Sequence, residues 1–139
     1  MATPATAGYS GKPLWQKLGL AAGMRVHVAS PPPQLDRLLA GAPKDLVRLP
    51  RLAECDFALA FVTKRRDVEG AFTRIAPKLA VGGMLWFAWP KRASGVATDV
   101  TEDALREIVL PRGFVDVKVC AIDATWSGLK FLRRKTTSG

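Results

Sequence analysis

The chain has 139 residues, 48% of them hydrophobic and 24% charged, which is typical of one globular domain with its own core. Its 21 basic and 12 acidic residues give a net charge of +9, which favours an anionic partner. No apolar run approaches the ~18 residues that cross a membrane, and the N-terminus lacks the cationic start and apolar centre of a signal peptide. We therefore expect a cytoplasmic protein without a membrane partner.

The domain boundaries follow from composition. Residues 1–8 are small and polar and are predicted to form a disordered tail, residues 9–135 a single α/β domain, and residues 136–139 a second tail. Cys55 and Cys120 lie far apart within apolar runs, which favours reduced, buried thiols over a disulfide. With these two cysteines and one histidine, a zinc site or a histidine-based metal site lacks ligands. No metal and no cofactor are predicted.

Helices and strands alternate in the first half of the chain. The patterns predict a short helix over 14–18, a strand over 24–30 and a short helix over 34–40. A weak strand over 46–52 contains a proline and is expected at an edge of the sheet. The nearly continuous apolar run 56–63 is typical of a parallel strand that is covered on both faces. His27, within the first strand, is expected to play a hydrogen-bonded structural role.

The clearest helix spans residues 67–79, where apolar side chains recur at helical spacing. Gly82-Gly83 is predicted to end this helix. A buried strand over 84–89 follows, and its two tryptophans, Trp86 and Trp89, are expected on one face, in the core.

The last third of the chain predicts one helix and two strands. Asp99 precedes Glu102 by three residues, a capping-box spacing that predicts a helix to about Leu110. Strands over 114–122 and 128–134 are predicted to pair directly as an antiparallel hairpin. The whole order predicts an α/β fold, with a mostly parallel sheet, helices on both faces and a C-terminal antiparallel hairpin.

This order of elements resembles that of class I S-adenosylmethionine-dependent methyltransferases, whose sheet ends in such a hairpin. The runs 18–28, 56–61 and 75–85 resemble the segments around that family's first strand, central strand and following helix and strand. The resemblance implies a Rossmann-like, methyltransferase-like fold.

The same family has glycines after the first strand and an acidic residue near the end of the second. Ser30-Pro31-Pro32-Pro33 stands at the first place and Arg48-Leu49-Pro50-Arg51 at the second. Proline has no N–H to donate and its ring adds bulk. The departures predict a degenerate site without the methyltransferase cofactor, and they argue against an enzyme.

A second resemblance covers roughly residues 8–135. The strings that begin at Gly8 (GYSGKPL), Trp89 (WPKRASGVATD) and Asp116 (DVKVCAIDATWSGLKF) are similar to those of a small bacterial family described as a domain of unknown function. This resemblance supplies no catalytic residues.

Ligands of open α/β sheets bind outside the carboxyl ends of the parallel strands. Four loops, residues 30–33, 63–66, 90–99 and 123–127, are expected to meet there, and residues 91–95 offer backbone N–H groups for an anion nest. The candidate ligand-binding residues of this rim are Lys64, Lys91, Arg92, Ser94, Gly95, Thr98, Asp99, Asp123, Trp126 and Ser127. Each also has an ordinary structural interpretation: Asp99 as a helix cap, Asp123 as the start of a turn, Trp126 as core.

Three functions compete. The first is a non-catalytic binding or regulatory module for an anionic small molecule at the rim. The second is binding of a nucleic-acid backbone through a basic face, with the candidate residues Arg66, Arg74, Lys78, Arg133, Arg134 and Lys135. The third is a diverged enzyme that uses Lys91, Asp99 or Asp123 as acid, base or clamp. Nothing in the sequence indicates a protein partner.

Overall fold

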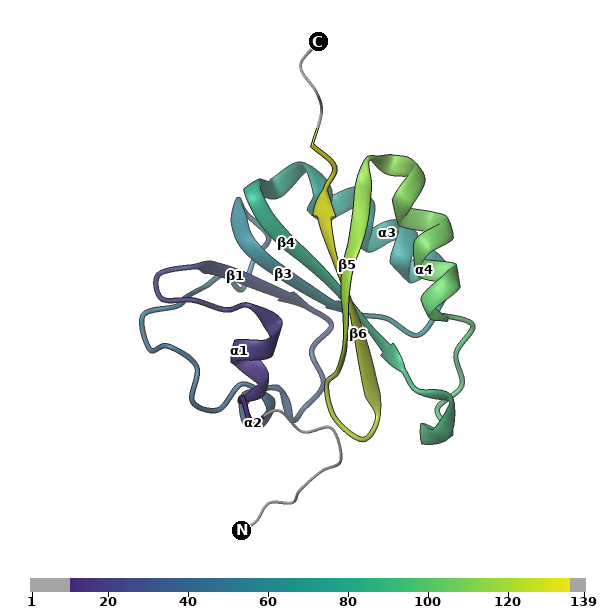
Figure 1. Ribbon diagram of the computed structural model, residues 1–139, viewed down its shortest axis with the longest axis horizontal. Coiled ribbons are helices and arrows are strands. Elements are labelled where there is room, and N and C mark those ends of the chain that lie inside the picture. The colour runs from purple at the N-terminus through teal and green to yellow at the C-terminus, as the bar shows by residue number, and fades with distance from the viewer. Residues whose placement is uncertain (1–10, 136–139) are drawn as a thin grey trace.

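The computed structural model describes residues 11–135, so the two predicted tails, residues 1–8 and 136–139, lie outside the described residues. The described chain forms one six-stranded mixed sheet with the strand order β2-β1-β3-β4-β6-β5 (Figure 1). The predicted α/β fold class is confirmed.

Four strands of the sheet are parallel. They are β1 (Arg25–Ala29), β2 (Val47–Arg48), β3 (Cys55–Phe61) and β4 (Leu79–Pro90). Strand β3 lies between β1 and β4 and is covered on both faces, as its continuous apolar run predicts. Strand β2 is an edge strand, as predicted, but it has two residues rather than seven.

The remaining strands, β5 (Phe114–Ala121) and β6 (Trp126–Arg133), form the predicted antiparallel hairpin. Strand β6 inserts between β4 and β5 and pairs antiparallel with β4 from Met84↔Leu132 to Pro90↔Trp126. The register between β5 and β6 shifts between Asp116 and Lys118, so Val117 forms a bulge in the edge strand.

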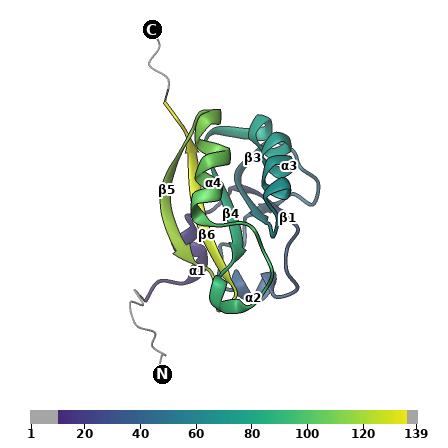
Figure 2. The same ribbon diagram turned by 90° about the vertical axis from the view of Figure 1, so that its right-hand side faces the viewer.

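Helices cover both faces of the sheet. Figure 2 shows α3 (Arg65–Ile75) and α4 (Glu102–Val109) on one side of the sheet and α1 (Leu14–Leu18) on the other. The four-residue α2 (Leu35–Leu38) packs on the same face as α1 and is shorter than the predicted helix over 34–40. His27, in β1, places its Nδ1 2.9 Å from the carbonyl oxygen of Leu49, consistent with the expected structural role.

Two apolar layers result, one on each face. Trp86 is fully buried in the layer under α1, and its indole N–H donates to the carbonyl oxygen of Leu18 at 2.9 Å. Trp89 is buried in the layer under α3 and α4. Their predicted location on one face is wrong, because residues three apart in a strand point to opposite faces.

The predicted end of the long helix is also wrong. Helix α3 ends at Ile75 and a 3₁₀ turn, η1 (Ala76–Lys78), leads directly into β4. Pro77 explains the early end, because it has no N–H for the helical ladder. Gly82-Gly83 lies inside β4 instead, next to the register shift that separates Cys55 from Phe57 in the pairing with β3.

Cys55 and Cys120 are both buried and unbridged, in opposite layers of the core, and burial raises the pKa of each thiol. Within residues 11–135, no helix has the length and apolar character needed to span a bilayer. Across the same residues, no group of three or more His, Cys, Asp or Glu side chains could hold a metal ion.

Candidate functional site

The loops after β1, β3 and β4 leave the sheet at the same end, because the carboxyl ends of parallel strands lie side by side. Strand β6 runs the other way and begins there, opposite the end of β4. Hydrogen bonds tie the loops together: the N–H of Lys91 donates to the carbonyl oxygen of Thr125 at 2.7 Å, and the Thr98 hydroxyl to that of Thr63 at 2.6 Å. This end of the sheet is called the rim below.

Asp99 is a helix cap, but of a different helix from the one predicted. Its Oδ1 accepts the backbone N–H of Arg65, the first residue of α3, at 2.8 Å. The cap of α4 is Thr101, whose hydroxyl accepts the N–H of Ala104 at 3.0 Å. The capping-box prediction is therefore wrong in its residue, because the spacing of Asp99 and Glu102 ignores the tertiary contact with α3.

Asp123 builds the turn between β5 and β6, as its structural interpretation predicts. Its Oδ1 accepts the backbone N–H groups of Thr125 and Trp126, both at 2.8 Å. Its Oδ2 accepts the Gln34 side chain at 3.2 Å and so links the turn to the start of α2. Both oxygens of this carboxylate are engaged in loop structure.

Three of the five backbone N–H groups of the predicted anion nest over residues 91–95, those of Lys91, Ser94 and Gly95, donate to backbone carbonyl oxygens. Residues 92–94 make a 3₁₀ turn, η2, in which the N–H groups of Ser94 and Gly95 donate to the carbonyl oxygens of Lys91 and Arg92. The Ser94 hydroxyl donates to Lys91 and accepts the N–H of Val96, and the Thr98 hydroxyl accepts that of Val100. These donors have no capacity left for an anion.

Trp126 packs against the protein. Its ring makes an edge-to-face contact with Phe61, at the end of β3, with the ring centroids 5.0 Å apart. The side chain is half-buried at the margin of the layer under α1. This contact supports the core interpretation of Trp126.

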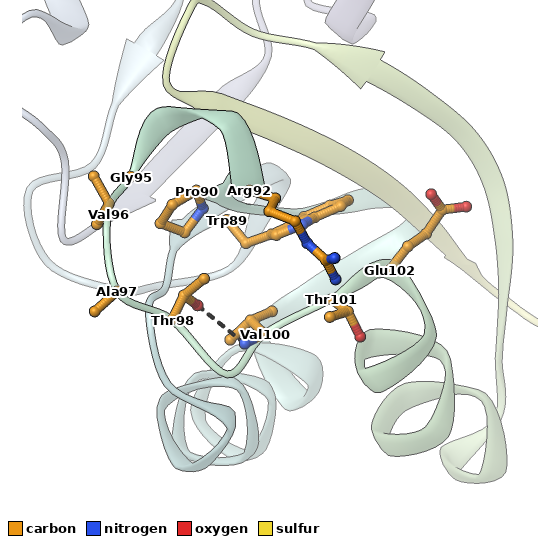
Figure 3. A pocket seen from close by; sticks show the side chains of 10 residues that line it. All are labelled: Trp89, Pro90, Arg92, Gly95, Val96, Ala97, Thr98, Val100, Thr101 and Glu102. Carbon is orange, nitrogen blue, oxygen red and sulfur yellow. Dashed lines mark hydrogen bonds between the residues drawn. The ribbon is translucent and has the colours of Figure 1, made fainter.

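A cavity of about 470 Å³ lies at the rim beyond the end of β4. Trp89 and Pro90, both buried, and Val100 supply apolar lining, and three of the candidate residues, Arg92, Gly95 and Thr98, also line it. Figure 3 shows the Arg92 guanidinium directed toward Thr101 and Glu102 at the start of α4. The other seven candidate residues do not line this cavity: Lys64, Lys91, Ser94, Asp99, Asp123, Trp126 and Ser127.

Arg92 is the unpaired charge of this lining. Glu102 pairs with Arg106 of its own helix, whereas among residues 11–135 no carboxylate pairs with Arg92. The sequence gives no direct signal for Thr101 and Glu102 as lining residues, since both are ordinary residues of a helix start. A cavity of this size is within the range of small-molecule sites.

The carboxylates whose pKa is shifted lie away from the rim. Arg25 donates from Nε and Nη2 to Asp56, both at 3.0 Å, at the end of the sheet opposite the rim. These bonds, together with the one from the Arg25 backbone N–H, hold the Asp56 pKa below its ordinary value. Arg106 lowers the Asp116 pKa in the same way, on the outer surface of α4 and β5.

Two cations of the predicted nucleic-acid face also have structural roles. Arg133 donates to the carbonyl oxygens of Leu79 and Ala76, and Arg134 to that of Leu110. They anchor β6 to the turns that end the two long helices. Arg66, Arg74 and Lys78 remain exposed on α3 and η1, and Lys135 is exposed at the end of the described chain.

The residues at the rim do not fit S-adenosylmethionine, the cofactor that the methyltransferase resemblance implies. Ser30 has a φ of +53° and leads into three prolines, which have no N–H groups to donate. The α2 helix after them has only four residues. A cavity of about 330 Å³ between β1 and β2 is lined by Arg48 and apolar residues, with no carboxylate to accept ribose hydroxyls.

No protein-family model matches the sequence, and no curated protein sequence does. Solved structures do match. Magnesium protoporphyrin IX methyltransferase from Synechocystis PCC 6803 is similar over 86% of this chain and 74% of that one, with a TM-score of 0.57 and 10% identity. Fibrillarin from Aeropyrum pernix is similar over 90% of this chain and 70% of that one, with a TM-score of 0.53 and 12% identity.

A third structure is an O-methyltransferase from neocarzinostatin biosynthesis, with a TM-score of 0.61 and 13% identity over 86% of this chain. The match spans 50% of that longer chain. Likeness at these identities concerns the fold alone. The chain has the Rossmann-like fold of S-adenosylmethionine-dependent methyltransferases, as its order of elements predicts.

Proposed function

We propose that this protein is a non-catalytic binding or regulatory module that holds an anionic small molecule at the rim of a methyltransferase-like fold. The observation that carries the proposal is the Arg92 cavity, the 470 Å³ space whose lining combines the unpaired Arg92 guanidinium with the apolar side chains of Trp89, Pro90 and Val100. A guanidinium beside an apolar surface suits an organic anion, since one end of the ligand pairs with charge while the other leaves water.

The rest of the rim supports a binding role over a catalytic one. Asp99 and Asp123, the carboxylates considered as acid or base, accept backbone N–H groups that build the loops. The residues after β1 and β2 do not fit the methyltransferase cofactor, which argues against methyl transfer from it.

Three related proposals concern context. We place the chain in the small bacterial family that its sequence strings resemble. We place it in the cytoplasm, where its two buried, unbridged thiols would stay reduced. An anionic small molecule is the proposed partner, with nucleic acid as the alternative.

The test is a thermal-shift panel with S-adenosylmethionine, its demethylated product, nucleotides, dinucleotides, phosphate and a short oligonucleotide, each at low and moderate salt. A ligand at ~100 times its Kd stabilises by about 2.7 kcal/mol, which shifts the Tm by several degrees. We expect an organic anion to shift the Tm at moderate salt and the shift to disappear in Arg92→Gln.

The matched control is Arg37→Gln, which removes the same charge from an exposed position on α2. It should bind like the wild type. A ligand that binds Arg92→Gln as well as wild type would refute this cavity as the site. Methyl transfer from S-adenosylmethionine by the purified protein would refute the non-catalytic role and favour the diverged enzyme.

A further inference from the structure

A second cavity of the rim lies between the carboxyl ends of β1 and β3 and the side of α3. Its volume is about 220 Å³, and its lining includes Ser30, Arg66, Asp67, Gly70 and Arg74. None of these residues lines the Arg92 cavity. The two spaces are therefore distinct.

Two arginines of this cavity have no partner. Among residues 11–135 no carboxylate pairs with Arg66 or Arg74, whereas the adjacent Arg65 pairs with Glu107 at 2.8 Å. Asp67 lines the same cavity. It lies in the first turn of α3, where its negative charge interacts favourably with the helix dipole. Two arginines and one aspartate thus line the same small space.

Gly70 lies between the two arginines on α3 and lines the same cavity. Residues 66, 70 and 74 are one turn apart on the same side of the helix, and helical side chains point toward the N-terminus. Arg74 folds back over Gly70, so that a Cβ added at Gly70 would lie 3.4 Å from its Nη1. Glycine is unfavourable inside a helix, and here its missing side chain leaves room between the two arginines.

The opposite wall supplies a hydroxyl. Ser30 is the only non-glycine residue with a positive φ in the described part of the chain, a conformation that turns it out of β1 at the cavity. Its hydroxyl forms no hydrogen bond with any residue that the structure describes. Hydroxyl and guanidinium groups donate hydrogen bonds to the oxygens of tetrahedral oxyanions, and one guanidinium can donate two parallel hydrogen bonds to one phosphate.

We propose that the cavity between Ser30 and α3 binds a phosphoryl dianion, either free phosphate or the terminal phosphate of a small monoester, through Arg66 and Arg74. The volume of about 220 Å³ is below the range of sites for larger ligands, which favours a group of this size. The proposal is independent of the Arg92 cavity, and no variant below alters that cavity.

The competing interpretation is the basic stripe, in which Arg66, Arg74 and Lys78 bind a nucleic-acid backbone together. Lys78 is exposed in η1 and does not line the cavity. If the stripe binds a nucleic-acid backbone, removing any one of the three charges should weaken binding by a similar factor, because the affinity depends on the number of neutralised phosphates. The cavity needs only the two arginines.

The experiment measures the affinity of inorganic phosphate and of glycerol phosphate by calorimetry, in chloride buffers of matched ionic strength. Arg66→Gln and Arg74→Gln should each weaken binding roughly tenfold or more, since each removes a charge-assisted hydrogen bond. Lys78→Gln should bind like the wild type. Tighter binding of glycerol phosphate than of phosphate would identify a monoester as the ligand, and the reverse order would identify the free ion.

A second variant fills the cavity without changing the charge. Gly70→Leu replaces glycine with a strong helix former on the side of α3 that lines the cavity, so it should raise the Tm of the free protein and abolish phosphate binding. Oligonucleotide binding through a surface stripe would survive this substitution.

Three results would overturn the proposal. The first is wild-type phosphate affinity in Arg66→Gln and Arg74→Gln. The second is an equal loss of binding in Lys78→Gln, and the third is unchanged phosphate binding in Gly70→Leu. An oligonucleotide that binds with steep salt dependence, with phosphate not binding at all, would assign the two arginines to nucleic acid instead.

Discussion

Asp99 accepts the backbone N–H of Arg65 at 2.8 Å although 34 residues separate the two in sequence. The loop that follows β4 thereby caps the helix that follows β3. Beside this bond, the Thr98 hydroxyl donates to the carbonyl oxygen of Thr63 at 2.6 Å. The two bonds hold the loop after β4 to the loop between β3 and α3. The positions of the Arg92 cavity and of the cavity beside Ser30 are therefore linked.

Replacing Asp99 with alanine should lower the free energy of unfolding by about 1 kcal/mol, because the first N–H of α3 loses its acceptor. Urea unfolding followed by circular dichroism measures the change. Asp99→Asn keeps an acceptor oxygen and should lose less than half as much. Equal losses in both variants would mean that charge, rather than the hydrogen bond, stabilises this contact.

Trp126→Ala should lower the free energy of unfolding by about 2 kcal/mol, because the half-buried ring loses its contact with Phe61. Ligand affinity at the Arg92 cavity should stay near the wild-type value, since Trp126 does not line it. Denaturant unfolding and calorimetry with the ligand from the panel check the two parts. Trp126→Phe is the matched control and should recover most of the stability. A variant of wild-type stability that has lost ligand affinity would instead show Trp126 to be a binding residue.

Asp56 should make stability depend on pH in acid. Arg25 lowers the pKa of the folded carboxyl, so between that pKa and the ordinary value of about 3.9 the unfolded chain binds more protons. The stabilisation is therefore fully present above pH ~4 and is lost as the pH falls through the folded pKa. The stability difference between wild type and Asp56→Asn should be largest near neutrality and should shrink below pH ~4.

The pH dependence of Asp56→Asn will not be flat, because Arg106 lowers the pKa of Asp116 in the same direction. The double variant Asp56→Asn with Asp116→Asn should remove most of the remaining slope. A constant difference between wild type and Asp56→Asn from pH 7 to pH 2.5 (a span of about 4.5 units) would show that the charge of Asp56 contributes nothing.

Gly128→Ala should lower the free energy of unfolding by about 1–3 kcal/mol through overpacking. A Cβ at this position would lie 3.1 Å from Cε3 of Trp86 and 3.1 Å from Cδ1 of Ile122, both buried. Gly70→Ala is a useful comparison, since the same change in a helix should raise stability by about 0.5–1 kcal/mol. Thermal unfolding of the two variants should thus shift in opposite directions.

Local patterns predicted most of the fold. Strand β3 followed from its uninterrupted apolar run, and the buried face of α3 from Val68, Phe72 and Ile75, which are all in the core. Boundaries failed where two signals competed. Gly82-Gly83 indicated a helix end, but Pro77 had already ended the helix one turn earlier and the glycines lie within β4.

The candidate site was predicted less completely, for two physical reasons. The sequence places Asp99, Ser94 and Thr98 at the rim, but it does not show that backbone N–H and carbonyl groups engage their side chains. Arg66 and Arg74 have the spacing of a solvent-exposed stripe. Only the three-dimensional structure shows that Gly70 between them and the end of β1 opposite them enclose a cavity.

The bulge at Val117 has a consequence for self-association. Val115, Val117 and Val119 are exposed on the edge strand β5, and a straight apolar edge of this kind is a template for adding strands from other chains. The bulge interrupts the ladder at Val117, and the charged residues Asp116 and Lys118 flank it. At the other edge, β2 offers only two paired residues. Within residues 11–135 neither edge strand presents a long regular ladder, which disfavours the addition of strands from other chains.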